Sequence, residues 1–553
     1  MDSFENSGYP YKIPFHIEPE KALRHRSLEH NRNTPIFRLP PETLSNIFTF
    51  CVPFPTQKLR DESGWVLPRS RQKPLEWLAF THVCCHWRAV AVNHSALWTC
   101  PDFTNPELAR EMLIRSKQSL LDIFFEEPAE RLQRKGLFIL LEVLGHGYRR
   151  IRSLDLDLGP GDMVMATSLM GHSVPFLKSL RLKTGAYGAH TPLPDNLLGG
   201  VSPALTQITL RNCDLPWGSG ILQNLTSLDL DGSMDHRPLS QEFYAVLNSS
   251  PRLRTLRIGT YAIPFKANME LPLVPLAHLK LISLTSDVPE ETANCTDLLE
   301  HLSFPGNTAI HISLSAWGRS ADPIVHSLQP LFNTLTQKFS DSRDGCPILK
   351  SVSLLGEDEE DEGVEMLLKA WRSADSPWEV GDSPRFSLSI DWASKFSFHW
   401  VEVARRALRI LPSKSVKTLR FGFLPNHVQI DDVIGILGPY LHGESSGLRN
   451  LHVQSTASTN QVLNALFKAS YGVQPQLAMS SLQSIFIKEI FVSDTVDFSL
   501  ALMRYLAWRM KEQSKLDRLV LIDCYDDLQD SQINVLRALV NVLERVELEH
   551  EEM

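Results

Sequence analysis

The sequence predicts an α/β protein in which a helical segment near the front is followed by a long array of alternating strands and helices. Three observations predict this arrangement. A phrase of the form L-x-x-L-x-L recurs between residues 151 and 521, helix-type apolar patterns lie between its copies, and a separate pair of helical patterns occupies residues 36–101. The chain has 553 residues, too many for one ordinary compact core, so several domains or an extended repeat array are expected.

Composition narrows the classes of function. The apolar share of 43% fits a folded soluble protein, and a net charge of −9 without a basic field disfavours a nucleic-acid partner. The cysteines, at positions 51, 84, 85, 100, 213, 295, 346 and 524, form no CxxC motif, which favours buried free thiols in a reducing compartment. No signal peptide and no membrane-spanning apolar run are recognisable. We therefore expect an intracellular protein, in the cytoplasm or nucleus, that does not contact a membrane.

Residues 1–35 are predicted as a polar arm, and the first helix is predicted to follow it. Pro40 and Pro41 fit a first helical turn, where a missing N–H is harmless, and Glu42 complements the positive end of the helix dipole. The apolar stripe of this helix is expected at Leu44, Ile47, Phe48 and Cys51.

A second helix is predicted after residues 52–74, whose prolines, glycine and mixed charges indicate an inserted surface loop. Its apolar positions are expected at Phe80, Val83, Cys84, Trp87, Val90 and Ala91. Asn93 and Ser95 can end this helix, and Leu97 and Trp98 follow as a large apolar anchor.

The signals L-P-x-E, I-F, V-C-x-x-W-R and L-W follow in order across residues 36–101, and this series resembles the F-box. The F-box is a small helical module that docks on a Skp adaptor of a cullin-RING ubiquitin ligase. The resemblance implies a set of adaptor-facing or module-completing residues: Leu39, Pro40, Glu42, Leu44, Ile47, Phe48, Val83, Cys84, Trp87 and Trp98. The inserted loop departs from a compact F-box, although similar insertions occur in the fungal F-box proteins that this sequence resembles.

Behind this head, a helix is predicted over residues 106–117 and a strand over 120–125, and then the leucine phrase begins. Clear copies begin at Ile151, Leu177, Leu205, Leu225 and Leu253, and weaker copies span 276–281, 299–304, 349–354, 416–421, 448–453, 482–487 and 516–521. The pair L-x-L places two side chains on one face of a short strand. One such unit cannot bury this face alone, whereas stacked neighbours can.

The early copies lie roughly 20 to 28 residues apart and the last copies roughly 34 apart, which is near or above the leucine-rich-repeat range. Helical patterns precede several strands, and Pro175, Pro203, Pro251 and Pro347 stand where they can end the preceding helix. Residues 102–553 are therefore predicted to form an irregular leucine-rich-repeat solenoid, an α/β horseshoe with parallel strands on its concave side, which resembles the leucine-rich tails of F-box proteins. Between residues 304 and 416 the phrase thins out, with degenerate strands expected at 311–314 and 386–390.

No pattern predicts catalysis, a metal or a cofactor. Residues 171–175 begin like a nucleophile elbow, but Pro175 replaces its final glycine. His82, Cys84, Cys85 and His86 lie close in sequence without a second ligand pair at zinc-finger spacing. The acidic run at 357–362 is interpreted as a solvated loop between repeats, with an electrostatic contact for a basic partner as the alternative.

Two functions remain in view. The leading hypothesis is a substrate-receptor subunit of an SCF-type ligase, which performs no chemistry itself, binds a Skp adaptor and through it a cullin, and holds an unidentified target protein on its repeats. The alternative is a leucine-rich interaction scaffold without ligase association, whose helical head only caps the repeat array. An enzyme of unknown type is a weaker third possibility, and we expect no enzymatic activity.

Overall fold

The computed structural model describes residues 29–30, 33–52, 76–127, 134–185, 190–232, 237–265, 273–288, 291–315, 324–339, 348–359, 363–374, 383–393, 399–425, 427–441, 447–471, 477–488, 495–523 and 530–547. The chain divides into two compact units, a head unit of residues 1–124 and 130–140 and a sheet unit of residues 125–129 and 141–553. Most of the predicted arm at 1–35, and all of the predicted loop at 52–74 except Val52, lie outside the described residues.

The head unit is helical. Its elements are the 3-10 helix η1 (Pro35–Arg38), α2 (Pro41–Cys51), η2 (Glu76–His82), α3 (Cys85–Asn93), η3 (Ser95–Trp98) and α4 (Pro106–Arg115). The division between the units falls within β1 (Leu121–Glu126) and α5 (Lys135–Glu142). As predicted, a proline opens α2 and Glu42 lies in its first turn. The side chain of Asn105 caps α4 by accepting a hydrogen bond from the Leu108 N–H.

The core of the head unit is built from apolar residues of α2, of the 3-10 helices η2 and η3, of α3 and of α4. Its buried members are Leu44, Phe48, Trp77, Phe80, Val90, Ala91, Leu97, Trp98 and Met112. The rings of Phe48 and Phe80 stack with their centroids 4.2 Å apart. The indole N–H of Trp98 donates to the Ala91 carbonyl at 2.9 Å, so this large side chain is buried with its polar atom satisfied.

The predicted second helix is interrupted. Cys84 has an extended backbone and acts as the N-cap of α3, its sulfur accepting from the Trp87 N–H at 3.4 Å. The helical period therefore restarts at Cys85, and Val83 is 59% exposed instead of buried. The prediction of one continuous apolar stripe through Val83 and Cys84 is wrong for this reason.

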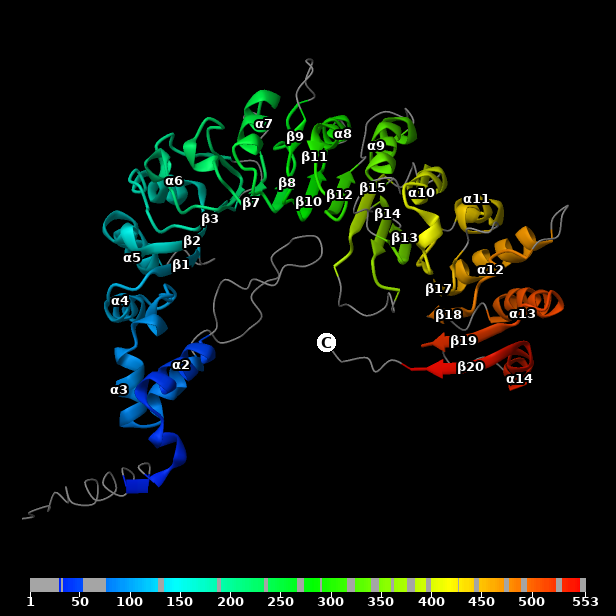
Figure 1. The fold of residues 1–553 in the computed structure, drawn as a ribbon, viewed down its shortest axis with the longest axis horizontal. Coiled ribbons are helices and arrows are strands. Elements are labelled where there is room, and N and C mark those ends of the chain that lie inside the picture. Colours follow the sequence, from blue (N-terminus) through cyan, green and yellow to red (C-terminus); the bar gives the residue numbers. More distant parts are fainter. Residues whose placement is uncertain are drawn as a thin grey trace, which may run out of the picture. The chain divides into compact units, whose positions relative to one another are not determined.

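The sheet unit contains one large sheet (Figure 1). Its strands, in spatial order, are β2 (Ile151–Leu158), β3 (Ser179–Thr184), β5 (Gln207–Arg211), β7 (Ser227–Leu230), β8 (Thr255–Ile258), β10 (Leu281–Ser286), β12 (Ala309–Ser315), β15 (Phe386–Trp392), β14 (Gly363–Trp371), β13 (Ser351–Glu359), β16 (Thr418–Phe421), β17 (Asn450–Gln454), β18 (Ser484–Lys488), β19 (Leu516–Ile522) and β20 (Val540–Val546). Neighbours pair in parallel, except that β14 is antiparallel to both β13 and β15. The α/β class predicted from the sequence is confirmed.

Helices connect these strands and lie on one side of the sheet in Figure 1. They are α6 (Pro160–Ser168), α7 (Ser240–Asn248), α8 (Thr292–His301), α9 (Ile324–Lys338), α10 (Trp400–Leu408), α11 (Ile430–Leu441), α12 (Thr456–Ser470), α13 (Thr495–Lys511) and α14 (Asp530–Leu539). Shorter helical turns are η5 (Val143–Gly147), η6 (Tyr148–Arg150), η7 (Leu197–Gly200), η8 (Gly220–Leu222) and η12 (Ser413–Ser415). Two small pairs complete the unit: β4 (Thr191–Pro192) with β6 (Cys213–Asp214), and β9 (Val274–Pro275) with β11 (Leu302–Ser303).

The leucine phrase folds as predicted where it is clear. In β7 and β8, Leu228 lies opposite Leu256 and both side chains are buried on the helix side, while the alternate residues face the open side. The weaker phrase at 276–281 is misplaced by three residues. Pairing with β8 makes Ile282 and Leu284 the buried positions of β10, so the folded phrase runs from Leu279 to Leu284.

Other weak copies need correction. Residues 299–304 belong mainly to α8 and β11, and the strand of the large sheet is β12, as the degenerate pattern at 311–314 predicted. Strand β15 contains the predicted segment 386–390, whereas β14 and β20 were not predicted. Residues 357–359 of the acidic run continue β13, so the loop prediction is wrong for them, and 360–362 lie outside the described residues.

Among the described residues, no helix is both long and apolar enough to cross a bilayer. The described cysteines, at 51, 84, 85, 100, 213 and 295, are free thiols. Cys213 and Cys295 are buried, as predicted, whereas Cys51 and Cys85 are exposed, so the prediction of burial is wrong for these two. Cys346 and Cys524 lie outside the described residues.

Candidate protein-docking site

Large apolar side chains on the surface of the head unit form the candidate docking site. Phe50 is 90% exposed and Ile47 is 40% exposed, and both lie on α2. Residues three apart on a helix share a side, so these two flank the stripe that buries Leu44 and Phe48. A helix that already has a buried face therefore carries a second apolar flank, which we call the α2 flank (Ile47 and Phe50).

The residues that the F-box resemblance implied separate into three groups. Leu44, Phe48 and Trp98 are buried in the head core and are not accessible to an adaptor. Leu39, Cys84 and Trp87 are half-buried. Pro40, Glu42, Ile47 and Val83 are exposed. Of the residues predicted for contact, those in the last group are accessible without any rearrangement.

Two exposed apolar residues were missing from the predicted contact set. Ile36 is 43% exposed at the start of the motif, and Phe50 is the most exposed large apolar side chain of α2. Phe50 does not fall on the apolar stripe of its helix, and a bulky aromatic residue off the stripe was the available signal. Ile36 was part of the motif itself but was not assigned to the contact.

Side-chain contacts hold the elements of the head together around α2. The Phe37 ring of η1 lies 4.8 Å from the imidazole of His86 on α3. The imidazole Nε2 of His94 lies 3.2 Å from the Thr49 hydroxyl of α2, and burial lowers the pKa of His94. The first contact joins η1 to α3, and the second joins the end of α3 to the helix that carries the α2 flank.

Side chains that could take part in catalysis or metal binding occur in both units. Among the described residues, no three His, Cys, Asp or Glu side chains are grouped to hold a metal, which includes the neighbours His82, Cys84, Cys85 and His86. In the sheet unit, the hydroxyl of Ser173 in the incomplete nucleophile elbow donates to the Val201 carbonyl at 3.1 Å.

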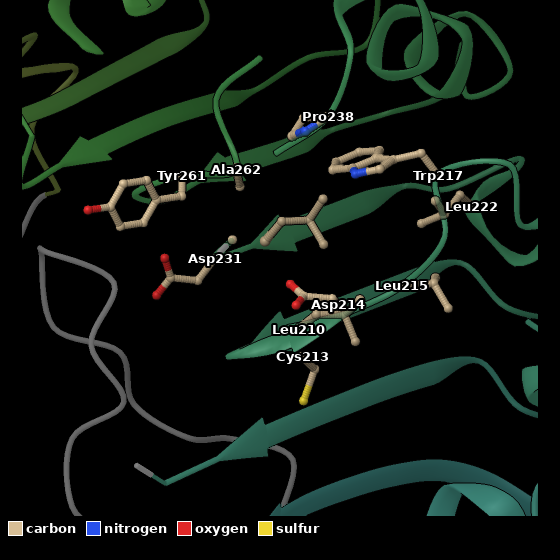
Figure 2. A pocket seen from close by; sticks show the side chains of 12 residues that line it. Leu210, Cys213, Asp214, Leu215, Trp217, Leu222, Asp231, Pro238, Tyr261 and Ala262 are labelled. Carbon is tan, nitrogen blue, oxygen red and sulfur yellow. The ribbon is translucent and has the colours of Figure 1, made fainter. Parts of the chain in front are cut away.

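A pocket in the sheet unit is the second candidate (Figure 2). It holds about 390 Å³ of empty space, which includes open solvent. Its lining comes from the ends of β5 and β7, from β6 and the segment after it, from η8, and from the segments before α7 and after β8. The lining residues are Leu210, Cys213, Asp214, Leu215, Trp217, Leu222, Leu230, Asp231, Gly232, Pro238, Tyr261 and Ala262. Leucine and aromatic side chains share this lining with Asp214 and Asp231, so the pocket presents polar as well as apolar groups.

Burial shifts the pKa values of two titratable groups that line this pocket. Burial raises the pKa of the Cys213 thiol to about 12, so it is not an activated nucleophile. Burial also raises the pKa of Asp231, while Arg211, with 3.4 Å between its guanidinium and that carboxylate, opposes the shift. Arg211 also pairs with Asp229 at 2.7 Å, which anchors the charges at this edge to the fold.

The open face of the sheet, away from the helices, is the third candidate. In its first strands this face carries ion pairs between neighbouring strands: Lys183 with Asp157 at 2.7 Å and Arg181 with Asp155 at 3.7 Å. Such a polar surface with anchored charges can bind a protein. Comparison with known families found no family model that matches the chain, and comparison with curated proteins found no matching relative.

Proposed function

We propose that the chain is the substrate-receptor subunit of an SCF-type cullin-RING ubiquitin ligase. Its head unit docks on a Skp adaptor, and through the adaptor on a cullin, while the sheet unit holds a target protein. One observation carries the proposal. The segment that resembles an F-box folds as a helical core of its own and leaves the large apolar side chains of the α2 flank outside that core.

An apolar flank on a small helical unit favours a protein partner. Burying an Ile or Phe side chain against a partner stabilises the complex by about 1.5–3 kcal/mol per residue. Exposed Val83 and Ile36 add apolar surface within the same motif. In the free chain these side chains contact water, so the contribution to binding is available without disturbing Leu44 or Phe48.

The sheet unit supports the receptor part of the proposal. From β2 to β12, and again from β16 to β20, each strand of the large sheet pairs with the next one along the chain. We interpret this unit as the irregular leucine-rich-repeat solenoid that the leucine phrase predicts, interrupted by the β13–β14 hairpin. Its open strand face would hold the target within reach of the ubiquitin-conjugating enzyme, which raises effective concentration without side-chain catalysis.

Titration calorimetry of the full-length chain with a purified Skp adaptor tests the docking. The wild type is expected to bind with a micromolar or lower Kd. The double variant Ile47→Ala/Phe50→Ala is expected to bind at least about tenfold more weakly, because it removes the exposed flank and leaves the core intact. The control Ile114→Ala removes a 71% exposed side chain of α4 outside the motif and should retain the wild-type affinity. No complex with the wild type, or equal binding by the double variant, would contradict the proposal.

The alternative remains a leucine-rich interaction scaffold that does not join a ligase. It is favoured by the burial of Leu44, Phe48 and Trp98, which act in folding rather than in contact. Under this alternative the head only covers the end of the array, and the Ile47→Ala/Phe50→Ala variant has no binding phenotype.

A further inference from the structure

A row of basic residues crosses five adjacent strands of the sheet unit where the parallel strands begin. The strands are β15, β14, β13, β16 and β17, in that spatial order. Each has one basic residue just outside this end, and we call the set the basic row: Arg385, Arg372, Lys350, Lys417 and Arg449. Positions spread over 100 residues of sequence are thus brought to one edge.

Backbone hydrogen bonds join the five strand ends that carry the row, with Arg385 offset by one position from Arg372 because it lies opposite Trp371. The N–H of Arg385 donates to Ala370 at 2.8 Å, and that of Lys350 donates to Trp371 at 2.8 Å. The N–H of Lys417 donates to Lys350 at 2.7 Å. The N–H of Arg449 donates in turn to the Lys417 carbonyl at 2.8 Å. Neighbouring strands lie about 4.8 Å apart, so the row spans roughly 19 Å.

The antiparallel strand β14 is required for this continuity. Its carboxyl end reaches the edge at which its neighbours begin, because Trp371 lies opposite Ser351 of β13. Arg372, the residue after this strand, is therefore level with Lys350, the residue before β13. A parallel strand at this place would have presented its first residues instead.

The positive charges of the basic row are not neutralised by the described residues. No ion pair joins any of the five to a described carboxylate, and Lys350, Arg372 and Arg449 are exposed. Arg385 donates to the Asn307 carbonyl, but its Nε is buried without a hydrogen-bond partner among the described residues. Burial and the like charge of Arg372 both lower the pKa of Arg385. An anion placed here would relieve this repulsion and satisfy the buried donor.

The other ends of the same strands carry the opposite charge. Glu365, near the start of β14, accepts a hydrogen bond from Ser389 at 2.6 Å. Asp391, near the end of β15, accepts one from Ser315 at 2.9 Å. An anionic segment is therefore favoured only along the edge that carries the basic row. A long polyanion lying over the whole face would meet these carboxylates, and the net charge of −9 also disfavours nucleic acid.

We propose that the basic row binds an extended acidic segment of a partner protein. An extended chain advances about 3.3 Å per residue, so a span of roughly 19 Å matches about six residues. This inference rests on the receptor role proposed above only in naming the partner as the ligase's target. The binding of the acidic segment itself does not require that role. Segments 340–347, 375–382 and 442–446 border the row in sequence and lie outside the described residues, so the inference is confined to the five described side chains.

Fluorescence anisotropy with the full-length chain tests the inference. The probe is a fluorescein-labelled peptide with a central run of about six glutamates, matched to the length of the row. The variant Lys350→Glu/Lys417→Glu/Arg449→Glu is expected to bind at least about tenfold more weakly than the wild type, and wild-type binding should weaken as salt rises. The neutral variant Lys350→Gln/Lys417→Gln/Arg449→Gln should lie between the two.

A matched control has the same change in net charge at exposed helix positions: Arg110→Glu/Arg504→Glu/Arg537→Glu. It should retain wild-type affinity, and an equal loss in this control would overturn the assignment to the basic row. Circular dichroism of every variant should show a wild-type thermal transition, and the neutral variant decides the result if charge reversal unfolds the chain.

Absence of peptide binding by the wild type, or unchanged peptide binding by both row variants, would overturn the inference. So would a single-stranded oligonucleotide that binds the wild type more tightly than the peptide does and whose binding is lost in the same variants. The two proposals can fail separately. The Ile47→Ala/Phe50→Ala variant should bind the peptide normally, and the row variants should bind the Skp adaptor normally.

Discussion

Arg509 of α13 is fully buried, and its five N–H groups all donate to oxygen atoms. The acceptors are the carbonyls of Met479, Leu482 and Ser514 and the hydroxyls of Tyr505 and Ser514, at 2.8–3.2 Å. These bonds join α13 to the turn that leads into β18. Because every N–H of the buried guanidinium has an acceptor, these bonds offset the cost of burying its charge.

His452 is the residue whose burial predicts a pH dependence. It lies on the open face of β17, where its ring stacks on Phe486 with centroids 4.2 Å apart. Burial, together with the charge of Arg420, lowers the pKa of His452 from 6.5 to about 3. Protonation therefore favours the unfolded chain. The stabilisation from the neutral ring is complete above pH 6.5 and is lost as the pH falls towards 3.

The variant His452→Phe removes this titration and keeps an aromatic ring beside Phe486. Between pH 6.5 and about pH 5, the unfolding free energy of the wild type should fall by about 2 kcal/mol relative to the variant. Urea unfolding of both proteins across this pH range measures the difference. Parallel pH profiles, or an imidazole signal by NMR that titrates near 6.5, would contradict the assignment.

The short helix η3 illustrates how one element closes the head unit. Trp98 ends this helix, and its indole meets Trp77 edge-on with centroids 5.3 Å apart. The guanidinium of Arg115 on α4 lies 4.5 Å above the same indole. Through Trp98, therefore, η2, η3 and α4 share one packed centre. The exposed side chain of Phe50 is not part of it.

We expect Trp98→Ala to lower the unfolding free energy of the head unit by about 3–5 kcal/mol, because it empties this centre. Phe50→Ala should change it by no more than about 0.5 kcal/mol, because its side chain is exposed. Hydrogen exchange in α2 and α3 of the full-length chain reports on both variants. Equal protection of α2 and α3 in the Trp98→Ala and Phe50→Ala variants would contradict the assignment of Trp98 to the head core.

At the scale of the whole molecule, the sheet unit is held together by contacts between consecutive strands. Strand order follows chain order except at β13–β15, where the hairpin reverses it. In such an arrangement each layer is stabilised mainly by its neighbours, and cooperativity falls with distance along the sheet. A core substitution should therefore act locally.

Leu451 of β17 is fully buried, and Leu451→Ala is expected to accelerate hydrogen exchange in β16, β17 and β18. Strands β3, β5 and β7 should keep their wild-type exchange rates. Hydrogen exchange followed by mass spectrometry resolves these segments. Uniform acceleration across the sheet would instead indicate that the sheet unit unfolds as one cooperative block.

The α/β class, the alternation of strands with helices, and the clear strands such as β2, β3 and β7 were determined by the sequence alone. Each of these follows from periodicity within a short stretch of chain, which local sequence contains. The same holds for the start of α2, where prolines and Glu42 act within one turn. For the candidate site, four residues of the predicted contact set, Pro40, Glu42, Ile47 and Val83, are exposed.

Only the tertiary structure decided which of several overlapping patterns is buried. Pairing with β8 selected Ile282 and Leu284 for the core in place of an earlier register, and capping by Cys84 exposed Val83. The antiparallel β14 and the assembly of the basic row depend on strand neighbours far apart in sequence. Burial and strand order arise from contacts between residues that are distant in sequence. The periodicity of a short stretch of chain does not specify which distant stretches it will contact.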